Sequence, residues 1–374
     1  MTESFGIALI GTGYMGKCHA LAYNAVNGVF SDCPKLRLEM LCDINSDAGR
    51  QFAEAFGFKQ FSTEWRDALT NPAVDIISIT TPNGLHKEMA LAALAAGKHV
   101  YCEKPLALTL ADAGIMAVAA RKSGLKTLVG YNYLYNPAIL NAARLIKEGA
   151  IGRVYFFRGV NDEDYMADPA LPHSWRCEVK KAGTGTLGDL AVHLVSLAHL
   201  LMGNITQLTA QTYIAHKNRL LEDHPDKTGT VDNEDIASAF VSFESGARGE
   251  LSSSRSAWGR KNHLTFEIHG DAGMITFDQE RMNELRLYSS HDKPEDQGFR
   301  IILTGPEHPP YASFIASRGH QLGFNDLKTM EVANLLRGLA GRDELYPDFD
   351  DALRIERVIH GMVRSSETGS SITL

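Results

Sequence analysis

Residues 5–16 read FGIALIGTGYMG, a short apolar run that leads into the pattern G-x-G-x-x-G. An apolar-rich segment (20–22) follows, so the stretch predicts a buried strand, a tight turn and a helix, the arrangement that binds a dinucleotide. Gly11 allows the sharp turn, Gly13 lets a pyrophosphate approach the backbone, and Gly16 permits close packing of helix on strand, with the helix N-terminus facing the phosphates. The predicted cofactor cradle comprises Gly11, Thr12, Gly13, Tyr14, Met15 and Gly16.

A second apolar strand, LEMLCDIN (38–45), ends in an acid, Asp43. A carboxylate there accepts hydrogen bonds from the adenosine ribose hydroxyls and repels a 2′-phosphate. Because Ile44 and not an arginine or lysine follows, NAD is favoured over NADP, with Asp43 and Ile44 beside the ribose. Asp43 is equally suited to cap a helix that starts near Ser46, and both roles are compatible.

The composition is that of an ordinary globular protein, and 374 residues suffice for two domains. A formal charge of −8 argues against nucleic acid or an anionic membrane as a partner. No apolar run approaches the roughly 20 residues that span a bilayer, and the first strand starts too early for a signal peptide. The five cysteines are scattered without a C-x-x-C pair, so we expect reduced thiols and a cytoplasmic protein.

Strands and helices alternate through residues 1–132, which predicts an α/β fold with a doubly wound parallel (Rossmann) sheet. From residue 133 to 374 strands follow one another with few helices, and several alternate apolar with polar side chains, as Leu264, Phe266 and Ile268 show. This pattern predicts an α+β domain on a mostly antiparallel sheet with one covered face. Two helices are expected to close the chain, near residues 326–339 and 348–365.

Lys104 lies in the loop Cys102-Glu103-Lys104-Pro105, directly after the predicted strand 99–102. Ligands of open parallel sheets bind beyond the carboxyl ends of the strands, so this lysine is expected to face a substrate. Its ammonium group can stabilise a developing alkoxide charge. The alternative is an ordinary surface lysine beside a loop-forming proline.

Asp189 and His193 stand four residues apart in the apolar segment GDLAVHLVS (188–196), on one face of a predicted helix that Ser196 continues. A carboxylate can fix the tautomer of a neighbouring histidine and support its cationic form, which suits proton transfer. The alternative is an acid placed in the first helical turn and a buried core histidine.

A metal site is not expected, because the sequence has no H-E-x-x-H or C-x-x-C pattern and two ligands alone do not hold zinc. A nucleophile elbow, G-x-S-x-G, is absent as well.

These motifs together resemble the Gfo/Idh/MocA oxidoreductases over nearly the whole chain. The resemblance rests on G-x-G-x-x-G, on Glu103-Lys104-Pro105 and on Gly188-Asp189-x-x-x-His193, and it extends to Thr81-Pro82-Asn83-x-x-His86 and the segment 347–354. It implies catalytic roles for Lys104, Asp189 and His193, and a Lys104–Pro105 bond that is often cis. Further cofactor contacts implied by the family motifs are Thr81, Asn83, His86, Glu103, Lys104 and Asn132.

Within the family, Asn132-Tyr133-x-x-Asn136-Pro137 and Ser174-Trp175-Arg176 look most like the levoglucosan and sugar 3-dehydrogenase branch. Leu134 replaces the usual arginine, which puts an anionic substrate in doubt. Trp175 offers a flat face to a sugar ring, although core packing is the alternative. The expected substrate-binding residues are Lys104, Tyr133, Asn161, Trp175, Arg176, Asp189 and His193.

The expected reaction is oxidation of a secondary hydroxyl of a sugar, anhydrosugar or cyclitol, with hydride transfer to NAD. His193 would take the proton, Asp189 would orient it and Lys104 would stabilise the oxygen, although Lys104 could be the proton acceptor instead. The motifs also allow NAD-dependent glycoside cleavage or a non-catalytic sugar sensor. The uncovered sheet face predicts a homodimer or homotetramer, as in relatives.

Overall fold

The computed structural model describes residues 3–374, except for the side chain of Pro225. The chain forms two compact units, of which the first comprises Met1–Asn132 and Gly323–Leu353, and the second Tyr133–Leu322 and Arg354–Leu374. The assignment of residues 323–353 to the second domain is therefore wrong. The reason is that α10 (Phe324–Leu339) packs along α1 (Tyr14–Val29), where it buries Lys328 and Glu331.

The first unit is built on six parallel strands in the order β3-β2-β1-β4-β5-β6, which confirms the predicted Rossmann sheet. The order reverses between β1 and β4, and such a reversal opens a ligand crevice at the carboxyl ends of the strands. The strands are β1 (Ser4–Ile10), β2 (Lys35–Cys42), β3 (Gln60–Ser62), β4 (Ile76–Ile79), β5 (His99–Cys102) and β6 (Thr127–Val129). The helices besides α1 and α10 are α2 (Ser46–Phe56), α3 (Arg66–Thr70), α4 (His86–Ala95) and α5 (Leu110–Ser123).

Local sequence signals explain where these helices begin and end. The Asn45 side chain caps α2 by accepting a hydrogen bond from the Ala48 N–H. The Thr109 side chain likewise caps α5 by accepting a hydrogen bond from the backbone N–H of Asp112. Both helices stop at a glycine in the left-handed region, Gly57 (φ 78°) for α2.

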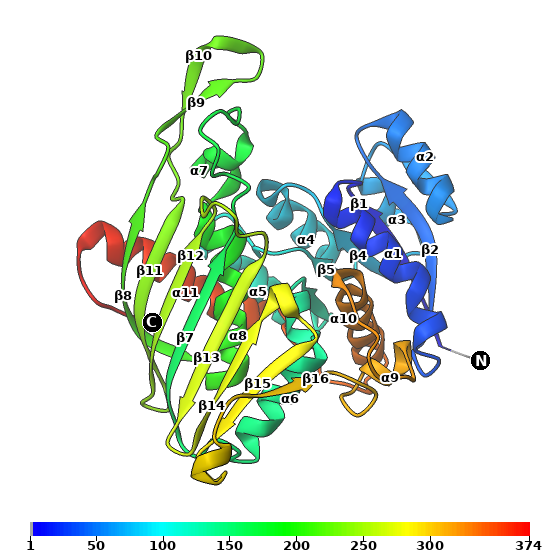
Figure 1. Cartoon of the computed structure of the whole chain (residues 1–374). Coiled ribbons are helices and arrows are strands. Elements are labelled where there is room, and N and C mark those ends of the chain that lie inside the picture. The colour runs from blue at the N-terminus through cyan, green and yellow to red at the C-terminus, as the bar shows by residue number, and fades with distance from the viewer. Residues whose placement is uncertain (1–2) are drawn as a thin grey trace. The chain divides into compact units, whose positions relative to one another are not determined.

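The second unit is built on a nine-stranded sheet in the order β16-β15-β14-β13-β7-β12-β11-β8-β17 (Figure 1). Only β7 and β12 pair in parallel among the described strands of this sheet, so the prediction of a mostly antiparallel sheet is confirmed. The strands are β7 (Val154–Asp162), β8 (Ile205–Tyr213), β11 (Ile236–Phe243), β12 (Arg248–Ser254), β13 (His263–Gly270), β14 (Gly273–Asp278), β15 (Glu284–Ser289), β16 (Arg300–Leu303) and β17 (Ile372–Thr373).

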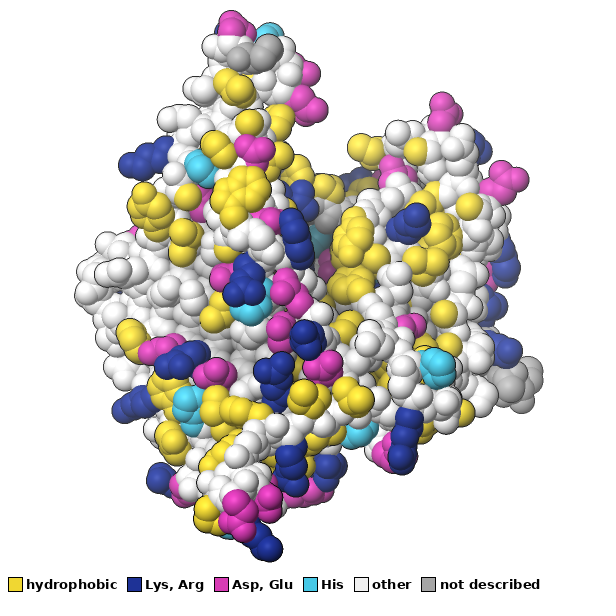
Figure 2. All heavy atoms as spheres, viewed as in Figure 1, with side chains coloured by type: hydrophobic (Ala, Val, Ile, Leu, Met, Phe, Trp, Pro, Cys, Tyr) yellow, Lys and Arg dark blue, Asp and Glu magenta, His cyan; other side chains and the backbone are white. Residues whose placement is uncertain are grey.

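One face of this sheet is covered by helices, and the other bears polar and charged side chains (Figures 1 and 2). On that open face Arg158 forms ion pairs with Glu250 and Glu267 from the two neighbouring strands, and Phe240 is 65% exposed. The helices of the unit are α6 (Pro137–Lys147), α7 (Val179–Ala182), α8 (Val192–Met202), α9 (Tyr311–Phe314) and most of α11 (Phe349–Thr368). A separate hairpin, β9 (Asn218–Leu221) with β10 (His224–Thr230), projects from this unit (Figure 1).

The stretch Val179–Met202 is long and apolar enough to cross a membrane by length and composition, which the sequence analysis did not anticipate. However, 83% of its most apolar window is buried inside the structure, as in the core helix of a globular protein. All five cysteines lie in the described part of the chain as buried free thiols.

Candidate active site

The glycine-rich loop between β1 and α1 has the geometry that a pyrophosphate requires. Gly11 has φ 100°, and its N–H donates to the carbonyl of Cys42. Gly13 stands at the N-cap of α1, and a Cβ placed there would meet no described atom within 4 Å, so the space above the loop is open. A Cβ on Gly16 would collide with the Gly11 carbonyl. The loop therefore fits the phosphates of a dinucleotide at a helix N-terminus.

Asp43 follows β2 and ties the end of that strand to the loop. Its Oδ2 accepts hydrogen bonds from the backbone N–H (2.8 Å) and hydroxyl (2.7 Å) of Thr12, and its Oδ1 accepts one from the Asn45 N–H (2.9 Å). A carboxylate accepts about four hydrogen bonds, so capacity for a ribose hydroxyl remains. Asn45 and not Asp43 caps α2. The side chain of Ile44 is 94% exposed beside it.

Lys104 is half-buried at the carboxyl end of β5, and its bond to Pro105 is cis. Two residues expected to contact the cofactor have other contacts here. The fully buried ring of His86 spans two loops, with Nδ1 2.9 Å from the Pro105 carbonyl oxygen and Nε2 3.0 Å from that of Thr81. The Glu103 carboxylate points into the protein interior, where it meets His19 and Lys328.

Three further residues of the predicted cofactor site lie around these loops. Thr81 and Asn83 are half-buried after β4, and Asn132 is buried (2% exposed) after β6.

Asp189 and His193 stand on a widened helical turn and not on a regular α-helix. Residues Leu187–Ala191 form a π-helical turn that continues directly into α8, and His193 is 8% exposed. A π-turn changes the partners of the backbone groups around it, and other groups must satisfy them. The Glu234 carboxylate accepts the N–H groups of Gly185 (2.7 Å) and Leu187 (2.9 Å).

Asn161 supports the same turn from β7. It is 1% exposed, and its Nδ2 donates to the carbonyl of Leu190 (2.9 Å). The Nδ2 group of Asn161, which was expected to bind substrate hydroxyls, is thus engaged beneath the helix.

The Asp189 carboxylate is held by two side chains. The Tyr165 hydroxyl donates to Oδ2 (2.6 Å), and Nε of Arg176 lies 3.9 Å from the same oxygen. Burial, together with the negative charge of Asp189, raises the pKa of Tyr165 well above its usual value, so this phenol stays a neutral donor. Sequence analysis missed Tyr165 because it stands 24 residues from its partner and in no motif.

Two aromatic rings adjoin these groups. The Tyr133 ring lies 4.6 Å from the His193 ring, and its hydroxyl accepts a hydrogen bond from Asn262 Nδ2 (2.9 Å). Trp175 is half-buried, and the Arg176 guanidinium lies over its indole at 4.4 Å. The second unit thus gathers Tyr133, Trp175, Arg176, Asp189 and His193, whereas Lys104 belongs to the first unit.

A buried ion pair supports the Arg176 backbone from below. Arg255 and Asp235 are 1% and 0% exposed, with Nε 2.7 Å from Oδ1. Arg255 also donates through Nη1 to the Arg176 carbonyl (3.1 Å), and Asn233 Nδ2 donates to the same oxygen (2.9 Å). The position of Arg176 beside Asp189 therefore depends on a charge pair in the core.

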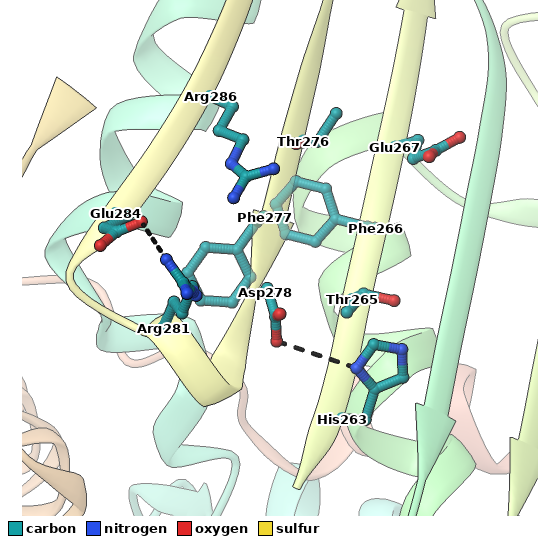
Figure 3. A pocket seen from close by; sticks show the side chains of 10 residues that line it. All are labelled: His263, Thr265, Phe266, Glu267, Thr276, Phe277, Asp278, Arg281, Glu284 and Arg286. Carbon is teal, nitrogen blue, oxygen red and sulfur yellow. Dashed lines mark ion pairs between the residues drawn. The ribbon is translucent and has the colours of Figure 1, made fainter. Parts of the chain in front are cut away.

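A different pocket of ≈ 280 Å³ is formed by β13, β14 and β15 (Figure 3). It contains none of the predicted site residues. Two of its lining residues, His263 and Asp278, bring possible metal ligands within 4.8 Å of one another together with Glu280, a grouping across strands that sequence spacing cannot show. Glu280 already accepts the N–H groups of Lys261 and Asn262.

Comparison with known proteins gives two family matches. Residues 5–131 match the profile described as "Oxidoreductase family, NAD-binding Rossmann fold", and residues 139–276 match the "GFO/IDH/MocA C-terminal domain". Levoglucosan dehydrogenase of Pseudarthrobacter phenanthrenivorans is 35% identical, with 97% of this chain and 96% of that protein covered. The scyllo-inositol 2-dehydrogenase (NAD(+)) of Bacillus subtilis is 28% identical, with 78% of each chain covered.

Solved structures agree with these matches. Levoglucosan dehydrogenase in complex with NADH and levoglucosan superimposes with a TM-score of 0.95 at 34% identity, and 99% of each chain is covered.

Proposed function

The chain belongs to the Gfo/Idh/MocA oxidoreductases with an NAD-binding Rossmann fold, and from this premise we propose that it oxidises a secondary hydroxyl of a neutral sugar, anhydrosugar or cyclitol to the ketone. NAD, when bound, supplies the hydride acceptor. The loop at Gly11–Gly16 and the carboxylate of Asp43 would hold it, since the open space above Gly13 fits a pyrophosphate.

In this proposal the chain's own residues handle the substrate oxygen. His193 accepts the hydroxyl proton as the hydride leaves the carbon, and the Asp189 carboxylate orients and supports the resulting imidazolium. The ammonium group of Lys104 stabilises the negative charge that develops on the oxygen. Tyr165 fixes the Asp189 carboxylate by its 2.6 Å hydrogen bond.

The observation that carries the substrate class is the engagement of Arg176. Its guanidinium faces the Asp189 carboxylate and stacks on Trp175. Leu134, at the position where the family resemblance leads us to expect an arginine, is buried and apolar (3% exposed). The charge of Arg176 is thus balanced by Asp189 and position 134 supplies no cation, which favours an uncharged polyol over a substrate with a carboxylate or phosphate.

The test is a screen of levoglucosan, free pyranoses and inositols for NADH formation, with uronic acids and sugar phosphates as the charged comparison. Net accumulation of NADH with a neutral polyol is expected. Release of glycoside product without net NADH would instead indicate glycoside cleavage, and binding without turnover would indicate a sensor.

The roles of Lys104 and His193 are tested by alanine variants on the substrate that the screen identifies. Each should lower kcat by about 10²- to 10⁴-fold with NADH affinity nearly unchanged, because both act on the substrate oxygen. The exposed Lys122 of α5 provides the matched control, Lys122→Ala. A His193→Ala enzyme that keeps more than about a tenth of the native kcat would make His193 a core histidine.

A further inference from the structure

A cluster of five buried ionisable side chains lies inside the first unit, behind the loop that carries Lys104. Its members come from three elements far apart in the sequence, and none is more than 4% exposed. They are His19 on α1, Tyr101 on β5, Glu103 directly after β5, and Lys328 and Glu331 on α10.

Lys328 is the only cation whose side chain lies within 4 Å of these carboxylates among the described lysines and arginines. Its Nζ lies 2.8 Å from Glu103 Oε1, 2.6 Å from Glu331 Oε2 and 3.3 Å from the Tyr101 hydroxyl. An ammonium group has three N–H donors, so these contacts use all of them. Burial opposes the charged form, but the two carboxylates outweigh it and raise the pKa of Lys328, so the side chain stays a cation.

Glu103 connects this cation to the loop of the proposed site. Its Oε1 accepts hydrogen bonds from Lys328 Nζ and from His19 Nε2 (2.7 Å), while its Oε2 lies 3.3 Å from the backbone nitrogen of Lys104. Gly130 leaves room for the carboxylate, since a Cβ there would lie 2.5 Å from Oε1. The position of Glu103, and with it the start of the Lys104 turn, is therefore set by contacts on both oxygens.

The hydrogen bonds around His19 show that this arrangement depends on an ionised Glu103. The Tyr23 hydroxyl donates to Ser78 Oγ (2.7 Å), and Ser78 Oγ lies 3.0 Å from His19 Nδ1. Nδ1 can then accept from Ser78 while Nε2–H donates to Glu103, which is the neutral imidazole. Lys328 and His19 together lower the pKa of Glu103 well below its usual value despite burial.

A second buried carboxyl group, that of Glu331, makes the ionised state of Glu103 depend on Lys328. Glu331 accepts a hydrogen bond from the Tyr101 hydroxyl, and burial, only partly opposed by Lys328, raises its pKa to about 7. Without the ammonium group, Glu103 and Glu331 would be two buried carboxyl groups with no described lysine or arginine beside them. Adjacent carboxyl groups in such a site cannot both stay ionised.

We propose that Lys328 is a positioning residue of the reaction, which acts through the Glu103 carboxylate to hold the turn that presents Lys104. The proposal rests on the role of Lys104 in the proposed function. A helix more than 200 residues later in the chain would then control the geometry of the loop at which the substrate oxygen is stabilised.

The experiment compares Lys328→Met/Glu331→Gln with Glu331→Gln. The single variant keeps a neutral Lys328–Glu103 pair, so the comparison isolates the ammonium group without leaving two unpaired carboxylates. We expect kcat to fall by at least about tenfold, because small displacements of a reacting group have large effects on rate. NADH affinity, measured by fluorescence titration, should stay within about threefold, since the phosphate cradle is untouched.

The matched control is Lys98→Met in the same unit. The Lys98 ammonium, just before β5, holds the backbone carbonyls of Asn71 and Val74 in the loop that precedes β4, at the strand end opposite the Lys104 turn. Its kcat should stay within about twofold of the native value, because only backbone contacts outside the Lys104 turn are lost. A double variant with kcat within about twofold of Glu331→Gln would overturn the positioning role.

A double-mutant cycle separates this proposal from the proposed function. In a Lys104→Ala background, loss of Lys328 should cost nothing further if it acts through Lys104. An additional loss of the same size would show a merely structural role. If Lys104→Ala alone retained native kcat, the proposed role of Lys104 would fail first, independently of Lys328.

Glu103→Gln provides a second test of the positioning role if the double variant does not fold. It leaves the Lys328–Glu331 pair neutral, and a glutamine offers one acceptor atom where glutamate offers two. Either the Lys104 N–H or the Lys328 contact must be lost, so kcat should fall while NADH binding persists. Native kcat in Glu103→Gln would refute the proposal.

Discussion

Replacing Arg255 with methionine should destabilise the second unit by about 3 to 5 kcal/mol, because it strands a buried carboxylate. Asp235 is 0% exposed, and its Oδ1 loses the 2.7 Å contact with Arg255 Nε. Its Oδ2 keeps the N–H groups of Ala215 (2.8 Å) and His216 (3.3 Å), which places the expected loss near the lower end of that range. A whole domain is stable by only about 5 to 15 kcal/mol, so the change is large.

Urea unfolding at constant pH measures this loss, and two variants control it. Arg255→Met/Asp235→Asn should recover much of the stability, because it removes the stranded charge while the amide oxygen can still accept the N–H groups of Ala215 and His216. Arg158→Met, an exposed arginine on the open sheet face, should leave the urea midpoint nearly unchanged.

The same variant has a catalytic readout. Arg255 holds the carbonyl of Arg176, whose guanidinium faces Asp189. We therefore expect kcat to fall while NADH affinity, which belongs to the first unit, is retained. If the free energy of unfolding of Arg255→Met were less than about 1 kcal/mol below that of the native protein, the reasoning would be refuted, since about 1 kcal/mol is the net contribution of one ordinary hydrogen bond.

Three further outcomes follow from other parts of the structure. Asp43→Ser with Ile44→Arg should shift cofactor preference from NAD toward NADP, and a native enzyme that turned over both equally well would contradict the placement of Asp43. Burial and the Lys328 charge lower the pKa of His19 from 6.5 to about 4, so the unfolded chain binds a proton that the folded protein refuses, and stability falls as pH drops through that range. In urea unfolding, His19→Gln should reduce the loss of unfolding free energy between about pH 6.5 and pH 5 by about 2 kcal/mol. If the variant lost as much stability over this range as the native protein, His19 would not be the group that causes the loss. The open sheet face, with Phe240 65% exposed, should pair with a second copy of the chain. Light scattering at micromolar concentration measures this, and a monomer would contradict the expected pairing.

The Rossmann unit could be predicted because its signals are local. The glycines of residues 11–16, the acid at the end of β2 and the glycine stops of α2 and α5 each act within a few residues of their own position. The alternation of Leu264, Phe266 and Ile268 likewise identifies β13 from one short stretch. Strand β8, with the sequence ITQLTAQTY, lacks a comparable pattern because Thr and Gln fill its exposed positions.

The site could be predicted only where a motif marks it. Asp189 and His193 were identified by their spacing, but the π-turn beneath them depends on Asn161 and Glu234, which stand 29 and 47 residues or more from the groups they bind. Lys328 is separated from Glu103 by 225 positions. In sequence it is one lysine on an amphipathic helix, and only the fold shows that it is buried against a carboxylate.

The return of residues 323–353 to the first unit has a consequence for how the protein is made. A ribosome releases the six strands of the Rossmann sheet long before it releases α10, so the nascent sheet must wait through the synthesis of the whole second sheet. During that interval the Glu103 carboxylate lacks the ammonium group of Lys328, and the surface of α1 that α10 covers is exposed to solvent or to chaperones. Completion of the nucleotide-binding unit is thus one of the last events of biosynthesis, and a chain cut short before residue 323 would carry every glycine of its cofactor loop without the helix that closes the fold around it.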